Sequence, residues 1–597
     1  MSNFSKILPG VSWGNSWKRS RQTRILVLGL CFLVGCLAGA AASLMHLLAE
    51  VLHGRCGELL SQCGDRAFWL APALPTLGIL FCVVLGRIFW RRHPMETNLW
   101  TAIREARHPG HGMRAYHAFS HILTSGTAVG LGISAGMEAP SALTGAAIGD
   151  NLGRKLGLPR ETRTLLLCAG AGGAIGGVFN APLAGALFTC EILLPGTSAV
   201  TLIPLLCAAA GGAIVSQLCG VNVRFPEIAY SWRMENLWLY LLAGLVCGLL
   251  SAVIIRLNCR MLRLRQWLGN PWIMALGGSV ALYLILLALP MLGGSGLEYV
   301  LAMMRSGQGA LHDGLLPISQ ATGWALLGSI ALCVFLKPLA SVISIQSGGD
   351  GGMFAPSLVT GAYMGFFFHY LLGMAHFTGF PLINCMAAGM AGILAGVMQA
   401  PLTGLFLIAE LLGGYQLFVP LMLVVAISSF ICRCLSKGNI YFAAAAAVQK
   451  SGKVPQINET MDDYQDTPVG ELADRSLYTL SPHDSFRTLL NILMHSPQEL
   501  FPVLDRQGRL VGVIQEKNLR PFLLERKLYD ILVVDDFMAL PPPDLPAEAP
   551  LAQATRIFDA TNAEFIPVTK DGCFLGVLTR AHLLESHRSL LTRTDLF

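Results

Sequence analysis

The sequence carries little charge for its length. Only 13% of its 597 residues are Asp, Glu, Lys or Arg, whereas soluble domains carry about 25%. Hydrophobic residues make up 53%, and the mean hydropathy is +0.57. The net charge is only +6, and no surface that combines basic and aromatic residues is visible, so nucleic acid is not expected as a partner. Much of the protein surface must instead lie in a lipid bilayer.

Groupings of residues that mark enzymes and metal proteins are also missing. The sixteen cysteines are scattered, many of them in apolar segments, and no CxxC pair occurs. We expect most of them to be small buried hydrophobic side chains, and we expect no metal site. No nucleophile with a neighbouring base is apparent. The chain is therefore not expected to be an enzyme, and no cofactor is required.

A basic stretch precedes the first long apolar segment. Residues 17–24 read WKRSRQTR, and the apolar segment runs from near Ile25 past Leu48, which is enough to span a bilayer, since about 20 residues suffice. The length, and the lack of a clear cleavage site, argue against a signal peptide. We interpret the segment as a membrane helix whose basic flank places the N-terminus in the cytoplasm. The short N-terminus and compact loops favour a bacterial inner membrane.

Composition divides the chain into four parts. Apolar segments broken by Gly and Pro predict a polytopic all-α membrane protein, and a polar linker separates them from a soluble α/β region. The predicted parts are a cytoplasmic segment over 1–24, a transmembrane domain over 25–447, a linker over 448–466 and a soluble module over 467–597.

The soluble module contains an internal repeat. Residues 500–505 lead into 510–514, and residues 565–569 lead into 574–578. Each unit is predicted to form a strand, a polar turn, a second strand and then a helix.

The membrane part also contains matching runs. Residues 136–149 read GMEAPSALTGAAIG and residues 352–365 read GMFAPSLVTGAYMG, with nine of fourteen positions identical. The one carboxylate of the first run, Glu138, is replaced by Phe354 in the second. A second pair, FNAPLAG and MQAPLTG, is offset by 401 − 182 = 219 positions, close to 354 − 138 = 216 for the first pair. The shared offset indicates duplication of a large unit.

These runs suggest an anion site. A Gly-rich turn that leads into a helix with Pro in its first turn presents free N–H groups and the positive end of the helix dipole. Two such ends would hold an anion between them, and broken apolar helices in both halves point to the interface of the repeats. Ionised, Glu138 would mimic the anion and block the path; protonated, it would swing away. The alternative is a structural carboxylate satisfied by nearby amides, but ionisable groups in membrane segments are by default functional.

Several motifs in order resemble one family. GMEAPS at 136–141 resembles the GREGP motif of the CLC chloride channels and chloride/proton antiporters, and SGGDGGMFAP at 347–356 resembles their GGxFAP motif. NAPLAG and QAPLTG match their paired xAPLxG helices. The soluble repeat resembles tandem CBS domains. The resemblance covers nearly the whole chain and implies CLC-type inverted repeats with broken helices, and a homodimer with one pore per subunit.

The resemblance also assigns roles to residues. Glu138 falls on the external gating glutamate, and the amides of Met353 and Phe354 fall on the central anion site. Tyr441, 441 − 410 = 31 residues after Glu410, falls on the tyrosine whose hydroxyl contacts the anion. The remaining residues implied to bind chloride or another small anion are Gly136, Met137, Gly352 and, by ungapped counting to the position of a missing serine motif, Thr97.

Three departures from the family pattern matter. Met137 and Ala139 replace the usual Arg and Gly beside the glutamate, and the missing serine motif leaves the preferred anion open. Ile192 stands where many antiporters carry an internal proton glutamate. Ile192 favours a passive chloride channel gated by Glu138, of the voltage-gated type. A chloride/proton antiporter is the alternative, and a transport-inactive sensor that signals through the CBS pair is a third.

Other buried polar residues receive simpler interpretations. Glu191 and Glu410 are expected to cap or brace helix ends, and His121 to be satisfied inside the helix bundle rather than to relay protons. Asp350 is unexpected beside an anion path, and we consider either exposure to the cytosol or pairing with a cation such as Lys337.

The CBS repeat leaves nucleotide binding open. The Thr/Ser and Asp that usually bind ribose and phosphate fall on Gln515 and Asn518 in the first unit, and on Thr579 and His582 in the second. Because the ribose-binding acid is absent from both units, a structural or dimerising role and binding of an adenine nucleotide both remain, and a motif alone does not decide.

Overall fold

The computed structural model divides the chain into two compact units, Met1–Pro455 and Gln456–Phe597, which are described separately below. The residues that the structure describes are 21–89, 99–107, 112–194, 199–221, 225–226, 232–310, 314–377, 379–436, 438–449, 468–475, 477–495, 498, 500–515, 519, 529, 532–561 and 564–579.

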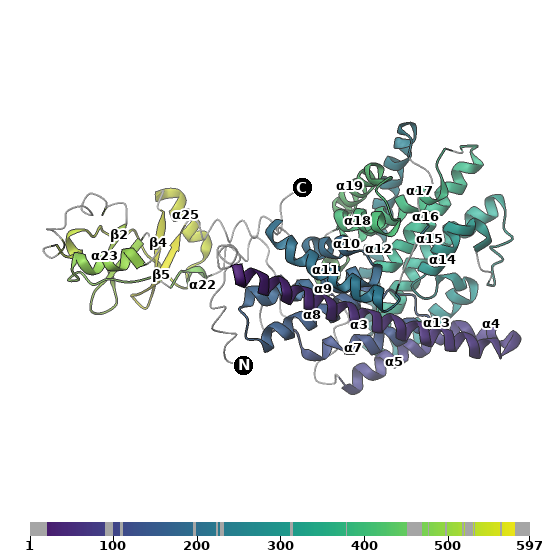
Figure 1. Ribbon diagram of the computed structural model, residues 1–597, viewed down its shortest axis with the longest axis horizontal. Helices are drawn as coiled ribbons and strands as arrows, with labels where there is room; N and C mark the ends of the chain where they lie inside the picture. The colour runs from purple at the N-terminus through teal and green to yellow at the C-terminus, as the bar shows by residue number, and fades with distance from the viewer. Residues whose placement is uncertain are drawn as a thin grey trace. The chain divides into compact units, whose positions relative to one another are not determined.

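The first unit is built from helices (Figure 1). In the part of the chain that is described, eight helices are long and apolar enough to cross a membrane. The predicted first membrane helix lies within α3 (Arg21–Ser61). The first half continues with α5 (Leu74–Phe89), α6 (Trp100–Arg107), α7 (Ser120–Gly130), α8 (Glu138–Lys155), α9 (Arg160–Phe179), α10 (Pro182–Phe188), a π-helical turn (Thr189–Leu193) and α11 (Ala199–Leu218).

The second half repeats this arrangement at its centre. It contains α12 (Leu237–Leu268), α13 (Pro271–Ala288), α14 (Leu297–Ser306), α15 (Gly323–Gln346), α16 (Phe354–Met374), α17 (Leu382–Met398), α18 (Pro401–Leu411), α19 (Phe418–Leu435) and α20 (Ile440–Gln449). The helices that begin in the matching runs, α8 and α16, each pack against the helix that follows.

Paired glycines bring these helices into close contact. A Cβ added at Gly145 of α8 would lie 2.2 Å from the carbonyl oxygen of Gly170, and one at Gly361 of α16 would lie 2.3 Å from that of Gly389. The offsets, 361 − 145 = 216 and 389 − 170 = 219, equal those of the sequence motifs. The same close helix crossing therefore occurs twice, once in each half.

The second pair of runs shares its backbone conformation. Asn180 and Gln399 end their helices in the left-handed region, at φ 51° and φ 50°. Ala181 and Ala400, which precede the two prolines, both adopt φ −127° and ψ 77°. Sequence matches that give the same backbone angles confirm that the two halves are structural repeats.

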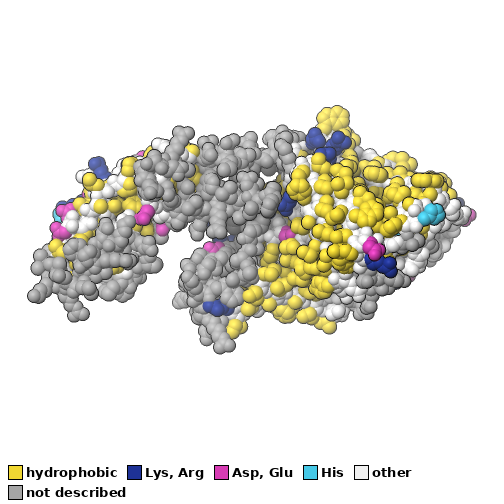
Figure 2. Space-filling model, turned by 90° about the horizontal axis from the view of Figure 1, so that it is seen from above, with side chains coloured by type: hydrophobic (Ala, Val, Ile, Leu, Met, Phe, Trp, Pro, Cys, Tyr) yellow, Lys and Arg dark blue, Asp and Glu magenta, His cyan; other side chains and the backbone are white. Residues whose placement is uncertain are grey.

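The surface of the first unit carries many exposed apolar side chains, visible as broad yellow areas in Figure 2. They include Leu37 and Leu44 on α3, Leu249 on α12 and Val280 on α13. A soluble protein would bury side chains of this kind, so the exposed apolar surface indicates contact with lipid.

The second unit contains the predicted strand pairs. Strand β1 (Leu500–Leu504) pairs antiparallel with β2 (Leu510–Gln515), and β4 (Phe565–Lys570) pairs antiparallel with β5 (Cys573–Thr579) and parallel with β3 (Leu545–Pro546). Helices α23 (Phe486–His495) and α25 (Leu551–Thr561) supply apolar side chains to their cores. The α/β repeat predicted from the sequence is therefore confirmed by its strand pairs, while the helices predicted to follow β2 and β5 lie almost entirely outside the described residues.

Candidate functional site

The two Gly-rich runs meet through their backbones. The N–H of Gly136 donates to the carbonyl of Gly352 (3.0 Å), and the N–H of Gly352 donates to the carbonyl of Gly136 (2.8 Å). A Cβ at Gly352 would lie 2.6 Å from the Cβ of Ala139, and one at Gly351 would lie 2.4 Å from that of Ala135. These two glycines let the loops touch, and the touching loops bring the first turns of α8 and α16 together.

The residues at the two helix starts are equivalent. Met137 caps α8 at φ −91° and ψ −3°, and Met353 caps α16 at φ −86° and ψ 3°. The next residues, Glu138 and Phe354, therefore occupy matching positions on opposite sides of the glycine pair. One repeat places a carboxylate there and the other an apolar ring.

The Glu138 carboxylate lies on the helix of the opposite repeat. Its side chain is buried, with 3% exposed, and its Oε2 accepts from the N–H of Ala355 in the first turn of α16 (3.4 Å). The N–H groups of Met353 and Phe354 precede this amide at the same helix end, where backbone donors lack helical partners. A negative charge is stabilised at such an end, so Glu138 occupies the kind of position that would hold an anion.

A buried hydroxyl lies near this carboxylate. Tyr441, near the start of α20, lies within electrostatic range of Glu138. The hydroxyl is buried, and among the described residues it has no hydrogen-bond partner. An unsatisfied buried O–H is unfavourable by about 1–3 kcal/mol, so an acceptor that is not part of the protein, such as an anion or water, fits this position.

Helix α6 follows the position of the missing serine motif and packs against Phe442, the residue after Tyr441. Trp100 of α6 contacts Phe442 edge to face (5.0 Å between ring centres), and the Arg107 guanidinium lies 4.4 Å from the centre of the same ring. Arg107 also donates to the carbonyl of Ile192 (3.0 Å). The Ile192 side chain is buried and has no group that binds a proton. Thr97 lies outside the described residues.

Glu191 and Glu410 cap helices in opposite repeats. Glu410 accepts from the N–H groups of Leu183 and Ala184 at the start of α10 (3.0 and 2.9 Å). Glu191 accepts from the N–H groups of Leu402 and Thr403 at the start of α18 (2.8 and 2.7 Å) and from the Thr403 hydroxyl (2.6 Å). The expected bracing role is confirmed. Each glutamate caps a helix of the other repeat, which the spacing of the motifs did not predict.

Asp350 has a different partner from the one considered. Its side chain is fully buried rather than exposed, its Oδ2 lies 2.8 Å from Nδ1 of His121, and the Thr124 hydroxyl donates to the same oxygen. Lys337 instead donates to the carbonyls of Leu292 and Gly294, at 3.0 Å each, and to the Ser134 hydroxyl (3.2 Å). Exposure to the cytosol is therefore wrong, and so is Lys337 as the partner; the ionisable group that pairs with Asp350 is His121. His121 has a hydrogen-bond partner at each ring nitrogen inside the bundle, as expected, and these contacts alone do not test whether it relays protons.

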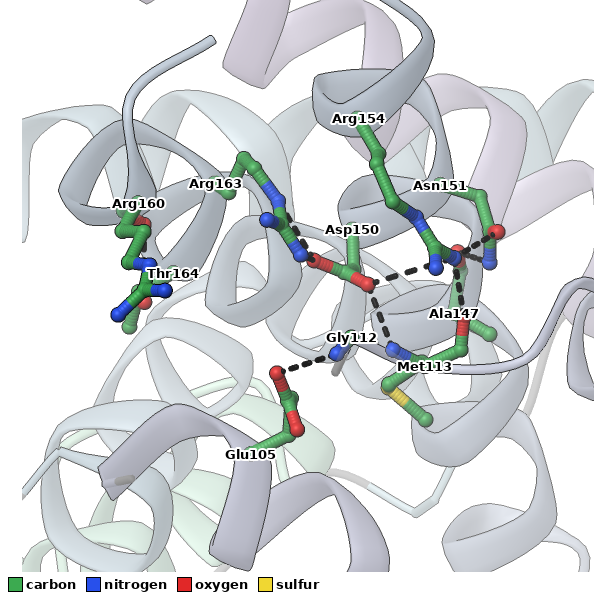
Figure 3. Close-up of polar contacts among 10 residues, drawn as sticks. All are labelled: Glu105, Gly112, Met113, Ala147, Asp150, Asn151, Arg154, Arg160, Arg163 and Thr164. Atoms are coloured by element: carbon green, nitrogen blue, oxygen red, sulfur yellow. Dashed lines mark hydrogen bonds and ion pairs between the residues drawn. The ribbon is translucent and has the colours of Figure 1, made fainter. Parts of the chain in front are cut away.

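A polar cluster that sequence reasoning missed surrounds Asp150, near the C-terminal end of α8 (Figure 3). Asp150 accepts from the N–H of Met113 (2.6 Å) and from Arg163 (2.8 Å), with Arg154 at 3.8 Å. The i, i+4 spacing of Asp150 and Arg154 was the available signal. The contacts fasten the segment before α7 to α8 and α9, which is a structural role.

The structure describes two of the four residues considered for a nucleotide in the second unit. Gln515 ends β2 and Thr579 ends β5, and both are half-buried. The offset, 579 − 515 = 64, makes them equivalent in the two CBS repeats. Asn518 and His582 lie outside the described residues.

Comparison with known proteins gives consistent matches. The pattern of the family described as voltage gated chloride channel matches residues 78–433, and that of the CBS domain matches 469–525 and 534–588. The H(+)/Cl(-) exchange transporter ClcA of Salmonella arizonae is 27% identical over 475 residues, covering 75% of this chain and 93% of the relative. ClcA of Salmonella typhi is 26% identical over the same length and the same shares.

Solved structures share the fold. A eukaryotic CLC transporter superposes with a TM-score of 0.62 at 18% identity, covering 94% of this chain and 99% of that chain. A slow cyanobacterial Cl-/H+ antiporter gives 0.61 at 20% identity, covering 72% and 98%. A CLC-type fluoride/proton antiporter gives 0.58 at 20% identity, covering 71% and 99%. The predicted fold class, a CLC-type helical membrane protein with tandem CBS domains, is confirmed.

Proposed function

Since this chain belongs to the voltage gated chloride channel (CLC) family, we propose that it exchanges chloride for protons across the membrane. Membership makes it an integral membrane protein for chloride transport with tandem CBS domains; the coupling to protons is the proposal. The curated relatives are named H(+)/Cl(-) exchange transporters. They favour the exchanger over the passive gated channel that Ile192 first suggested.

The main observation behind this proposal is that the Glu138 carboxylate accepts a hydrogen bond from the N–H of Ala355. While ionised, the carboxylate fills the helix end and keeps an anion out. A proton removes its charge and with it most of the attraction to the helix dipole, so the side chain leaves and chloride takes its place. Chloride and the proton then bind in turn to one region, which couples their movements.

The anion site would combine donors from several elements. The amides of Met353 and Phe354 would face the ion from α16, and the Tyr441 hydroxyl would donate from α20. Gly136, Met137 and Gly352 would line the site through the paired loops, with Thr97 as a further hydroxyl. None of these groups carries a negative charge, so apart from Glu138 nothing in the proposed site would repel an anion.

The wider setting follows the family. We propose a homodimer with one pore per subunit in a bacterial inner membrane, with the N-terminus and the CBS module in the cytoplasm. Transport rather than catalysis is the activity that family membership supports. At the CBS pair, Gln515 and Thr579 end equivalent strands and would contact an adenine nucleotide. Binding of labelled ATP to the full-length protein, weakened in Thr579→Ala, tests that part; equal binding by the variant contradicts it.

Transport by purified protein in liposomes tests the exchange. An outward chloride gradient is imposed without a protonophore, and chloride and external pH are recorded together. We expect uphill proton movement driven by chloride, lost in Glu138→Gln and kept in Glu50→Gln, a control at an exposed glutamate of α3.

Other outcomes have distinct meanings. Chloride release that sets up a voltage without proton movement would favour the passive channel, which Ile192 supports. No chloride movement would favour another anion, with fluoride and nitrate tested next, or a sensor that signals through the CBS pair.

A further inference from the structure

Three buried titratable side chains form a continuous line in the membrane unit. Nδ1 of His117 lies 3.1 Å from Nε2 of His121, and Nδ1 of His121 lies 2.8 Å from Oδ2 of Asp350. The two imidazole rings are nearly parallel, at 8° with 5.4 Å between centres. All three side chains are at most 3% exposed. They come from a short 3-10 turn (Ala115–Ala118), from α7 and from the loop between α15 and α16.

The two ends of this His–His–Asp line have different surroundings. At one end, the ring of His117 contacts that of Tyr116 (4.3 Å), which is half-buried, and Arg114 nearby is exposed. At the other end, Oδ1 of Asp350 is buried, and within the described chain nothing donates to it. A buried carboxylate oxygen without a partner is unfavourable, so this oxygen fits a water molecule or a proton.

The line ends at the loop that holds the gate in place. Asp350 precedes Gly352 by two residues, a span of at most about 7 Å. Gly352 pairs with Gly136, which in turn lies two residues before Glu138.

The other polar groups around the line are few. Cys82 of α5 lies beside Asp350 and donates to the carbonyl of Thr124. The Thr124 hydroxyl faces Asp350, and Arg114 approaches His117.

We propose that His117, His121 and Asp350 carry protons between a surface of the membrane unit and the gate, a role that Ile192 cannot fill. This inference rests on the proposed exchange. It gives the exchanger a proton route on the residues of this chain where the family's internal glutamate is absent.

The hydrogen-bond geometry allows a balanced transfer. His117 takes a proton at Nε2 and gives its Nδ1 proton to Nε2 of His121. His121 gives its own Nδ1 proton to Oδ2 of Asp350, which becomes neutral. Asp350 then releases a proton to water that reaches the paired loops. One proton enters and one leaves, and each imidazole exchanges only which nitrogen carries hydrogen.

A structural role is the competing explanation. The same contacts also hold α7 against the loop before α16, and a brace of this kind needs hydrogen bonds but no proton transfer. Glutamine and asparagine keep hydrogen-bonding groups yet cannot relay a proton, so they separate the two roles. His369, which bonds to the carbonyl of Phe380 (2.9 Å) outside the line, offers a matched control.

The experiment compares full-length His117→Gln, His121→Gln, Asp350→Asn and His369→Gln in liposomes. Chloride and proton flux are measured together in each variant under the same imposed chloride gradient. We expect the first three variants to retain chloride flux and to move at least about a hundredfold fewer protons per chloride, in keeping with the loss of one proton-transfer group. The proton-to-chloride ratio should remain unchanged in His369→Gln.

Two results would overturn the proposal. One is an unchanged proton-to-chloride ratio in both His117→Gln and Asp350→Asn; the other is a parallel loss of both fluxes at a constant ratio, which is the result of a brace. If variants at His121 or Asp350 do not fold, His117→Gln decides, since His117 has the more peripheral contacts. If the unmodified protein already moves chloride without protons, the proposed exchange itself fails, and the relay falls with it.

Discussion

Oε2 of Glu138 lies 3.4 Å from the backbone nitrogen of Ala355, which belongs to the helix of the opposite repeat. The duplication therefore does more than build two similar halves. One half supplies the carboxylate and the other supplies the helix end that attracts it. Phe354, at the position that matches Glu138, leaves the reverse arrangement without a charge, so a single gate serves the site.

This arrangement predicts how chloride flux responds to pH. Ionised Glu138 blocks the helix end and protonated Glu138 releases it, so flux in the unmodified protein should rise as pH falls. Glu138→Gln carries no charge at any pH, and its chloride flux should be high and flat. Chloride efflux from liposomes over a series of pH values measures both. Flux that does not depend on pH in the unmodified protein contradicts this mechanism.

Much of the fold could be predicted because it depends on local sequence patterns. The offset of 216 positions between Glu138 and Phe354 recurs between Gly145 and its counterpart Gly361. Each of these glycines lies at an equivalent helix crossing, since a duplicated sequence folds into duplicated crossings. The Asn–Ala–Pro turn at 180–182 and the Gln–Ala–Pro turn at 399–401 likewise adopt the same backbone angles. Periodicity and turn chemistry act over a few residues, and they identify the helix ends that make the site.

Contacts between distant polar residues could not be predicted in the same way. Asp350 and His121 are 350 − 121 = 229 positions apart, and no local pattern links a loop carboxylate to a helix histidine. Charge alone suggested Lys337 as the partner, but three neutral oxygens already surround that amine. Which polar groups meet is decided by helix packing, and burial then determines that each must find a partner.

The glycine crossings predict a steric effect on stability. Gly145→Ala would place a methyl group 2.2 Å from the carbonyl oxygen of Gly170, so the helices must separate. Overpacking of this kind destabilises by about 1–3 kcal/mol. Gly277→Ala in α13, where a Cβ meets nothing within 4 Å, is the control. Thermal unfolding in detergent should show a lower Tm for Gly145→Ala alone; an equal Tm for both variants rules out a tight crossing.

The exchanged glutamate caps predict unequal losses. Glu410→Gln weakens two backbone hydrogen bonds at the start of α10, whereas Glu191→Gln weakens two backbone bonds and one from the Thr403 hydroxyl. Bonds to a charged acceptor contribute about 1.5–3 kcal/mol each, and glutamine keeps one neutral acceptor. Tm should fall in both variants and further in Glu191→Gln. A normal Tm with lost proton coupling would instead assign these residues to ion movement.

The Tyr441 hydroxyl provides the sharpest test of the anion site, because its removal changes one donor and leaves the ring in place. Nothing in the described structure accepts from this buried hydroxyl, so Tyr441→Phe should not destabilise the protein. A hydrogen bond to an ion contributes about 1.5–3 kcal/mol, which corresponds to roughly tenfold or more in affinity. Calorimetric titration with chloride should show that loss, with Tyr415→Phe, at an exposed tyrosine, unchanged. Equal affinity in Tyr441→Phe would mean that the hydroxyl faces water rather than chloride, and that the amides of α16 hold the anion without it.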